Sequence, residues 1–227
     1  MTITQSLYHT FQRYRTLQTD HIKALPVVIL MPHSACNCRC VMCDIWKDNK
    51  NLKQLTEKDI RSLLVSLKRL GTQQVLMSGG EAMLNPHFFR FCEILSAHHI
   101  RISVLSTGLT LKKHAASLVK HVHDVIISLD GDEDTHNRTR NIPHAFRTLK
   151  EGVLYLKRLD PFFRITARSV IHRQNFRQWP AIIEEARAMG LTFLTDQDAR
   201  PAGSAHPNTH LWDNGTSAAA ELDRVMT

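Results

Sequence analysis

Four of the five cysteines in this sequence lie within eight residues. Cys36, Cys40 and Cys43 follow a Cys-x3-Cys-x2-Cys spacing, and three thiolates at that spacing can hold three corners of a [4Fe-4S] cube from one loop. The fourth iron then has no protein ligand and is open to a small molecule. Because protein-bound clusters can reach strongly negative reduction potentials, the spacing indicates one-electron chemistry on a bound small molecule.

The same segment offers a second arrangement, because Cys38 adds a fourth thiol. Four thiolates can hold a structural zinc ion in an interaction module without catalysis, although tetrahedral zinc sites prefer two separated pairs of cysteines. The first residues lack the apolar core of a secretion signal, so clustered thiols indicate a reducing compartment, and we expect a cytoplasmic protein. The fifth cysteine, Cys92, lies among phenylalanines and is expected to be a buried, inert thiol.

The cysteines follow directly after an apolar run of strand length. Strand and helix patterns then alternate, which is typical of a parallel α/β sheet with right-handed crossovers, either an open doubly wound sheet or a partial barrel. Thr56 and Asp59 form a capping-box pattern at the start of one helix. Either architecture places function at the carboxyl ends of the strands. Strands are expected at 27–31, 74–77, 102–105, 125–129, 165–171 and 191–195, and helices at 56–70, after 85–86, at 111–121, 143–159 and 180–190.

Three parts are expected along the chain. Residues 1–25 contain an amphipathic helix that we expect to pack against the main domain, which covers 26–198. Residues 199–227 form a polar tail that we expect to be poorly ordered. The stripe of the first helix consists of Ile3, Leu7, Phe11, Tyr14 and Leu17.

Composition limits the function classes further. The chain has 227 residues, 43% of them hydrophobic, which is enough for one substantial core. Its longest apolar stretch, 24–32, is too short to cross a bilayer, so no membrane span is expected. A formal charge of +8 favours anionic partners, but the basic residues are spread along the chain, so no dedicated nucleic-acid patch is indicated.

Several motifs together resemble the radical S-adenosylmethionine (SAM) enzymes. Residues 36–43 match the Cys-x3-Cys-x2-Cys loop of that family, and Met-Ser-Gly-Gly-Glu at 77–81 matches its Gly-Gly-Glu motif. Ser-Thr-Gly at 106–108 stands where many members have Thr-Asn-Gly. Ile-Ser-Leu-Asp-Gly at 127–131 is similar to the Ser-x-Asp-Gly of the branch with molybdopterin-precursor synthases and peptide maturases. The matches are collinear over about residues 26–198.

The resemblance implies a six-stranded parallel partial (βα)6 TIM-like barrel with one [4Fe-4S] cluster and SAM as cofactors. A reductant such as flavodoxin or ferredoxin would supply the electron that cleaves SAM to a 5′-deoxyadenosyl radical, which abstracts hydrogen from an unidentified small-molecule, peptide or RNA substrate. No cysteine follows Cys92, so we expect no auxiliary-cluster domain in this chain. The polar sequence after the sixth strand leaves open a truncated family member that binds a cluster without activity.

The resemblance also assigns roles to individual residues. Cys36, Cys40 and Cys43 would be the cluster ligands, and a bulky residue at Gly80 is expected to block SAM binding while sparing the cluster. The expected SAM contacts are Gly79, Gly80 and Glu81 at the methionine amino group, Ser128 at the carboxylate or ribose, the main chain of Met42 at adenine, and Thr107, Asp130 and Arg168 nearby.

Four features depart from the family pattern, and the first is the absent Asn of Thr-Asn-Gly at 106–108. Cys38 replaces a typical leucine, Ala82 replaces a usual proline, and no Gly-x-Ile-x-Gly motif lies near the fifth strand. These changes affect the SAM contacts more than the cluster ligands. The polar segment 132–140 is expected either to line the mouth of the barrel or to be a solvated loop.

Overall fold

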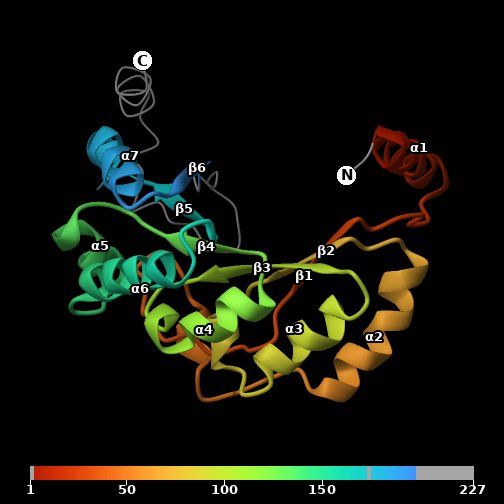
Figure 1. Cartoon of the computed structure of the whole chain (residues 1–227), viewed down its shortest axis with the longest axis horizontal. Helices are drawn as coiled ribbons and strands as arrows, with labels where there is room; N and C mark the ends of the chain where they lie inside the picture. Colours follow the sequence, from red (N-terminus) through yellow and green to blue (C-terminus); the bar gives the residue numbers. More distant parts are fainter. Residues whose placement is uncertain (1–2, 173–174, 198–227) are drawn as a thin grey trace.

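The computed structural model describes residues 3–172 and 175–197, and the predicted polar tail at 199–227 lies outside them (Figure 1). Among the described residues, no helix is both long and apolar enough to span a membrane. The chain alternates strands and helices from residue 27 onward, as the sequence pattern predicts.

All strands of the described residues belong to one parallel sheet whose order in space follows the order in the sequence, β1-β2-β3-β4-β5-β6. The α/β class and the parallel sheet are therefore confirmed. Since every pairing is parallel, the carboxyl ends of neighbouring strands meet at one edge, where Ser128 lies opposite Arg168. The strands are β1 (Val27–Leu30), β2 (Gln74–Met77), β3 (Arg101–Ser106), β4 (Asp124–Ser128), β5 (Arg164–Ile171) and β6 (Thr192–Gln197).

The helices α2, α3, α4 and α6 lie together on one side of the sheet (Figure 1). The capping box predicted at Thr56 is confirmed: its side chain accepts a hydrogen bond from the Asp59 amide, and the Asp59 carboxylate accepts one from the Thr56 amide. The helices are α1 (Ile3–Thr19), α2 (Glu57–Arg69), α3 (Phe88–Ser96), α4 (Leu111–His121), α5 (Glu133–Arg140), α6 (Ala145–Leu159) and α7 (Trp179–Ala188), with short 3-10 helices at Ile45–Asp48, Ala82–Leu84 and Phe176–Gln178.

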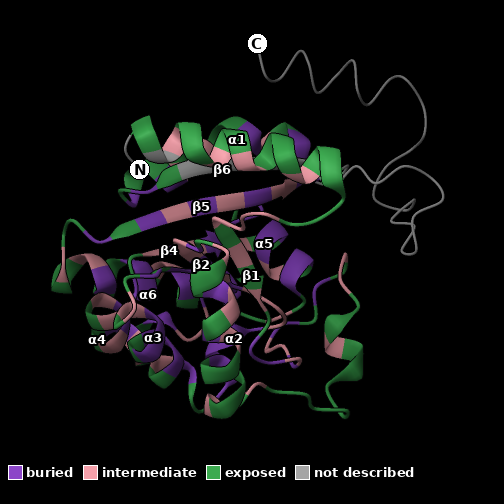
Figure 2. Cartoon of the chain, turned by 90° about the vertical axis from the view of Figure 1, so that its right-hand side faces the viewer, coloured by how far each residue is buried: buried purple, intermediate pink, exposed green. Residues whose placement is uncertain are grey.

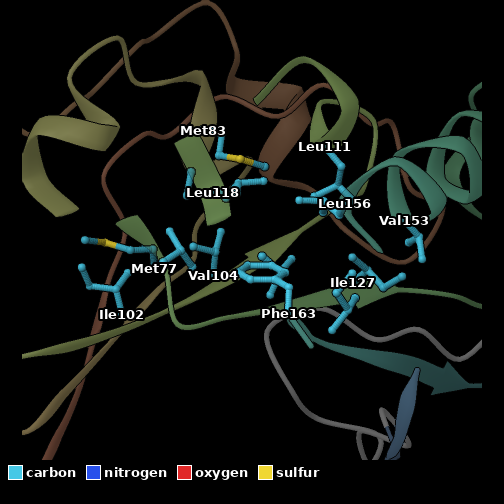
Figure 3. Packing of buried hydrophobic residues seen from close by; sticks show 14 of the residues in the cluster. Met77, Met83, Ile102, Val104, Leu111, Leu118, Ile127, Val153, Leu156 and Phe163 are labelled. Carbon is cyan, nitrogen blue, oxygen red and sulfur yellow. The ribbon is translucent and has the colours of Figure 1, made fainter. Parts of the chain in front are cut away.

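The core fills the space between this helical layer and the sheet (Figure 3). Alternate strand residues such as Met77, Val104 and Ile127 are fully buried there, because successive side chains of a strand point to opposite faces. Cys92 is part of this core, which confirms the prediction of a buried thiol, and burial raises its pKa to about 12. The opposite face of the sheet is less covered, and Ile29 on β1 is 59% exposed.

The helix α1 forms where the sequence predicts it, but its apolar stripe does not pack against the main domain (Figure 2). All of its members are exposed among the described residues, from 58% for Phe11 to 82% for Ile3, so that expectation is wrong. A polar contact, His9 Nε2 to Gln73 Nε2 at 3.0 Å, joins α1 to the segment before β2. Apolar residues at helical spacing indicate that a helix forms, but they do not show which part of the protein the apolar face will pack against.

Candidate functional site

A cavity of about 260 Å³ lies at the carboxyl edge of the sheet, beside the loop that contains the cysteines. It brings together nine of the residues singled out in the sequence: Cys36, Cys40, Cys43, Met42, Gly79, Gly80, Thr107, Ser128 and Arg168. Six further lining residues had no role assigned from the sequence, although Ser78 and Ser106 belong to the quoted motifs and Arg140 to the segment 132–140. They are Ile45, Ser78, Leu105, Ser106, Arg140 and Val170. Six separate segments of the chain therefore meet around one space.

The cysteine loop is held mainly through its main chain. The side-chain amide of Asn49 accepts a hydrogen bond from the Cys36 N–H and donates one to the Cys36 carbonyl, both at 3.0 Å. Trp46 Nε1 donates to the Cys40 carbonyl at 3.2 Å. On the other side, the N–H groups of Arg39 and Val41 donate to the carbonyls of the last two residues of α5 at 3.1 and 3.0 Å. The loop conformation is thus fixed independently of most of its side chains.

The turn after β2 packs directly on this loop through two glycines. Gly79 has φ +111°, a conformation that favours glycine, and the Glu81 N–H donates to the Ala35 carbonyl at 2.9 Å. A Cβ atom at Gly80 would lie 2.1 Å from the Ala35 carbonyl oxygen. Since Ala35 precedes Cys36, a side chain at Gly80 would displace the cysteine loop itself. The structure therefore predicts that a bulky residue there would disturb the cysteine loop as well as any SAM contact.

Glu81 does not line the cavity. Its carboxylate is fully buried, and Oε2 accepts hydrogen bonds from the Thr107 N–H at 2.8 Å, the Thr107 hydroxyl at 2.7 Å and the Ser106 hydroxyl at 3.1 Å. Burial raises the pKa of Glu81, and these hydrogen bonds oppose the rise. Glu81 therefore ties the glycine turn to the end of β3, where Thr107 faces the cavity.

Asp130 is likewise buried behind the cavity wall and does not line it. Its Oδ2 lies 2.5 Å from Arg140 Nη2, and its Oδ1 accepts a hydrogen bond from the Val170 N–H at 3.2 Å. Arg140 also donates from Nη1 to the sulfur of Cys40 at 3.5 Å. The carboxylate thus reaches the cysteine loop through a guanidinium that the sequence did not single out.

Arg140 comes from α5, which occupies the segment 132–140 that was expected either to line the mouth of the barrel or to be a solvated loop. Because Arg140 lines the cavity, the first alternative agrees with the structure at this residue. The Asp132 side chain caps the helix by accepting from the Thr135 N–H at 2.8 Å, and Asn141 ends it at φ 51°. The buried side of α5 is polar and consists of Thr135, His136, Thr139 and Arg140. Because those residues show no apolar period, the sequence pattern does not reveal the helix.

The four clustered thiols differ in their electrostatic surroundings. Burial raises the pKa of Cys36 to about 11 and also raises that of Cys43. The pKa of Cys40 is lowered to about 6, first by a hydrogen bond from the Cys38 thiol and then by Arg140, while the same hydrogen bond raises the pKa of Cys38. Cys38 is buried outside the cavity that the other three share. Cys40 is the thiol of the group that ionises most readily.

His136 lies beside the buried ion pair, with Nδ1 accepting a hydrogen bond from the Asp130 N–H at 3.3 Å and lying 4.0 Å from Asp130 Oδ2. Burial lowers its pKa to about 4, with Asp130 opposing and Arg140 reinforcing the shift. The unfolded chain therefore binds a proton near pH 6.5 that the folded protein resists until about pH 4. This stability is complete above pH 6.5 and is lost as the pH falls through that window.

We expect His136→Gln to flatten the acid limb of the stability curve. Between pH 6.5 and 4 the free energy of unfolding of the parent should fall by about 3 kcal/mol more than that of the variant. Urea denaturation across this range measures the difference. The matched control is His21→Gln at an exposed histidine, whose curve should follow the parent. Parallel curves for the parent and His136→Gln would contradict the prediction.

The comparison with protein families gives one match that covers most of the chain. The model of the radical SAM superfamily matches residues 30–192. The chain belongs to the radical SAM superfamily. The matched region runs from the end of β1 to the start of β6 and contains every residue that lines the cavity. Members of this superfamily are enzymes that carry an iron–sulfur cluster and use SAM.

Curated relatives are about a quarter identical to this radical SAM protein over the aligned regions. Fe-coproporphyrin III synthase of Methanosarcina barkeri is 26% identical over 162 residues, which are 70% of this chain and 40% of that protein. The mycofactocin maturase MftC of Mycobacterium tuberculosis is 25% identical over 184 residues, 78% of this chain and 45% of that protein. The chain thus spans less than half the length of these relatives.

A solved structure shows the same fold. The crystal structure of Streptococcus suis SuiB superposes with a TM-score of 0.74 at 14% identity, over 96% of this chain and 51% of SuiB. SuiB has also been solved with SAM and with its precursor peptide SuiA.

The residues of the cavity fit an iron–sulfur cluster. Cys36, Cys40 and Cys43 present sulfur donors to one space from a loop held by its own main chain, and Gly79 and Gly80 keep the wall beside it free of side chains. Within the described part of the chain, no three His, Cys, Asp or Glu side chains are gathered closely enough to hold a single metal ion.

We expect Asn49→Ala to loosen the cluster without abolishing its assembly. The change removes both hydrogen bonds that hold the Cys36 main chain, at a cost of about 1 kcal/mol for these exposed contacts, so iron should be lost several-fold faster. The rate of iron transfer to a chelator under anaerobic conditions measures this. Asn51→Ala is the matched control, because Asn51 donates to Asp48 in the same loop without touching a cysteine. Equal rates in the two variants would show that Asn49 does not hold the loop.

Proposed function

We propose that this chain is the catalytic domain of a radical SAM enzyme, a partial barrel over residues 26–198 that holds a [4Fe-4S] cluster on Cys36, Cys40 and Cys43. The observation that carries the proposal is the single cavity in which those cysteines meet the glycine turn after β2 and the ends of β3, β4 and β5. When bound, the cluster would supply the electron that cleaves SAM and leads to hydrogen abstraction from a substrate.

Different residues of the cavity wall would contact different parts of SAM. The main chain of Gly79 and Gly80 is open to the methionine amino group, because no side chain covers it. Ser128 and Arg168, opposite each other on β4 and β5, present a hydroxyl and a cation to the carboxylate or the ribose. Met42 lines the same cavity, and its main chain would contact adenine. Glu81 and Asp130 act from behind the wall by fixing Thr107 and Arg140.

The substrate class that we propose is a peptide. A PqqA peptide cyclase of Bradyrhizobium diazoefficiens is among the relatives, and the structural neighbour SuiB has been solved with a precursor peptide. MftC and the sporulation killing factor maturation protein SkfB of Bacillus subtilis are named for maturation, which is compatible with this class. Two relatives from Methanosarcina barkeri are named for porphyrin or heme synthesis, so a porphyrin is the comparison substrate. A reductant such as flavodoxin or ferredoxin in the cytoplasm would deliver the electrons.

The test is the formation of 5′-deoxyadenosine. The protein is reconstituted anaerobically with iron and sulfide and incubated with SAM and a strong reductant, beside Cys40→Ala and the control Cys92→Ala. We expect product with the parent and with Cys92→Ala, whose buried thiol lies in the core, and none with Cys40→Ala. Bound zinc without iron or sulfide would overturn the proposal in favour of a zinc module, and a full cluster without SAM cleavage would favour an inactive family member.

The substrate class is tested separately in the active protein. Peptides from a cell extract and an iron porphyrin are offered in parallel, and each arm is examined for a substrate mass change that depends on SAM. A change in the peptide arm supports the proposal. A change confined to the porphyrin arm, or SAM consumption with neither substrate altered, would overturn the peptide assignment.

A further inference from the structure

Arg140 links the cysteine loop to a buried carboxylate. Its Nη1 donates to Cys40 Sγ at 3.5 Å, its Nη2 lies 2.5 Å from Asp130 Oδ2, and its side chain is 9% exposed. The Asp130 side chain is fully buried and pairs with the other terminal nitrogen of the guanidinium. The cation therefore touches the sulfur directly, and the compensating anion lies one group further away.

Main-chain hydrogen bonds hold the end of α5, which carries Arg140, against the cysteine loop. The carbonyl of Arg140 accepts a hydrogen bond from the Arg39 N–H at 3.1 Å, and the carbonyl of Thr139 accepts one from the Val41 N–H at 3.0 Å. These bonds flank Cys40 on both sides in the sequence. Because the loop and the end of α5 are joined in this way, the contact between guanidinium and sulfur is built into the fold.

A cation at this position acts on electron transfer as well as on geometry. A cluster on Cys40 becomes more negative when it gains an electron, so a nearby positive charge stabilises its reduced state more than its oxidised state. Hydrogen bonds to ligand sulfur act in the same direction and are among the factors that set cluster potentials. Screening by water is weak, because both Arg140 and Cys40 are buried. Asp130 opposes the effect from a greater distance.

We infer that Arg140 is a positioning residue that raises the reduction potential of the cluster on Cys40, and that Asp130 limits this rise. The inference rests on the proposed function, since it presupposes a cluster at these cysteines. It goes beyond that proposal by assigning opposite electronic effects to the two members of one ion pair. Their signs distinguish tuning from a purely structural role, which would not give opposite shifts.

The test is the midpoint potential of the reconstituted cluster, followed by electron paramagnetic resonance during reductive titration without SAM. Arg140→Gln should shift the potential to more negative values, and Asp130→Asn should shift it to more positive values. Arg138→Gln is the matched control, because Arg138 lies on the same helix and its Nη2 donates to the Thr135 hydroxyl. It should leave the potential where it is in the parent.

The possible outcomes distinguish a failure of the inference from a failure of the proposed function. A parent protein without a cluster would overturn both. A loaded Arg140→Gln protein with the parent potential, or shifts of the same sign in both variants, would overturn the inference alone. If Arg140→Gln takes up no iron, Arg140→Lys keeps the charge and should regain both iron and a potential near that of the parent. A folded Arg140→Lys protein that also fails to load, as judged by circular dichroism and iron content, would overturn the tuning role.

Discussion

Cys40→Ala should leave a folded protein that takes up no stable cluster, whereas Cys38→Ala should take up iron and sulfide close to the parent level. Cys40 lines the cavity and is the thiol that ionises most readily, and Cys38 is buried outside the cavity. Losing a ligand should cost more than the 10- to 100-fold typical of groups that only support ligands, so SAM cleavage should fall by more than about 100-fold. Iron and sulfide analysis of both variants measures the contrast.

Cys38→Ala also checks the alternative of four zinc thiolates. In that arrangement all four thiols are equivalent ligands, and either variant would lose metal. The Cys38 variant should lose only a buried sulfur atom and its hydrogen bond to Cys40, at about 1 kcal/mol of stability. Equal loss of bound iron in both variants would contradict the assignment of ligands.

The substitution Gly80→Ala should reduce stability and cluster content together. A single methyl group would lie 2.1 Å from the Ala35 carbonyl oxygen and 2.9 Å from the Cys36 nitrogen, both main-chain atoms that cannot rotate away. Overpacking of this kind costs about 3 kcal/mol, and here the strain falls on a loop that carries a ligand. Thermal denaturation and iron analysis of the same preparation measure both losses.

Gly152→Ala is the matched control for that experiment. Its added methyl group would meet the Leu111 side chain at 2.8 Å in the core between α4 and α6, away from the cysteines. We expect it to lose about 1 to 2 kcal/mol while keeping its iron. If Gly80→Ala also kept its iron in the folded protein, the close packing of the glycine turn on the cysteine loop would not matter for the cluster.

The sheet could be predicted from the sequence because strands such as β1, β2 and β4 contain short apolar runs, and these runs alternate with helical patterns along the chain. The strand expected at 74–77 and the helix expected at 111–121 have those bounds in the structure. The residues that follow the strands were correctly expected at one edge, since parallel strands end together. Nine of the expected site residues consequently line one cavity.

Two features escaped prediction because periodicity does not encode them. The helix α5 buries polar side chains, so its inner face looks like a solvated loop in the sequence. For the same reason the sequence pattern did not indicate a role for Arg140. The start of the helix could have been recognised, because Asp132 is a favourable N-cap residue and its side chain accepts a hydrogen bond from the Thr135 N–H. The apolar stripe of α1 led to a wrong prediction of packing, because the periodicity of a helix does not specify what its apolar face contacts.

The sequence also could not predict whether a buried carboxylate points into the cavity or away from it. Glu81 and Asp130 follow strands that end at the cavity, and both were expected to contact a ligand. In the structure, the Thr107 N–H and hydroxyl donate to Glu81 Oε2, and Asp130 Oδ2 forms an ion pair with Arg140. The local sequence places such residues near a site, but only the competing donors around them decide whether they face into it.

The hydrogen bonds that join the cysteine loop to α5 have a consequence for how such a protein matures. They use only the protein's own main chain, so the entropy of ordering the loop is lost when the chain folds. Small zinc domains differ, because they fold only around their metal. Here the fold already orders the loop, so a cluster inserted at Cys36, Cys40 and Cys43 would not have to organise its own binding site.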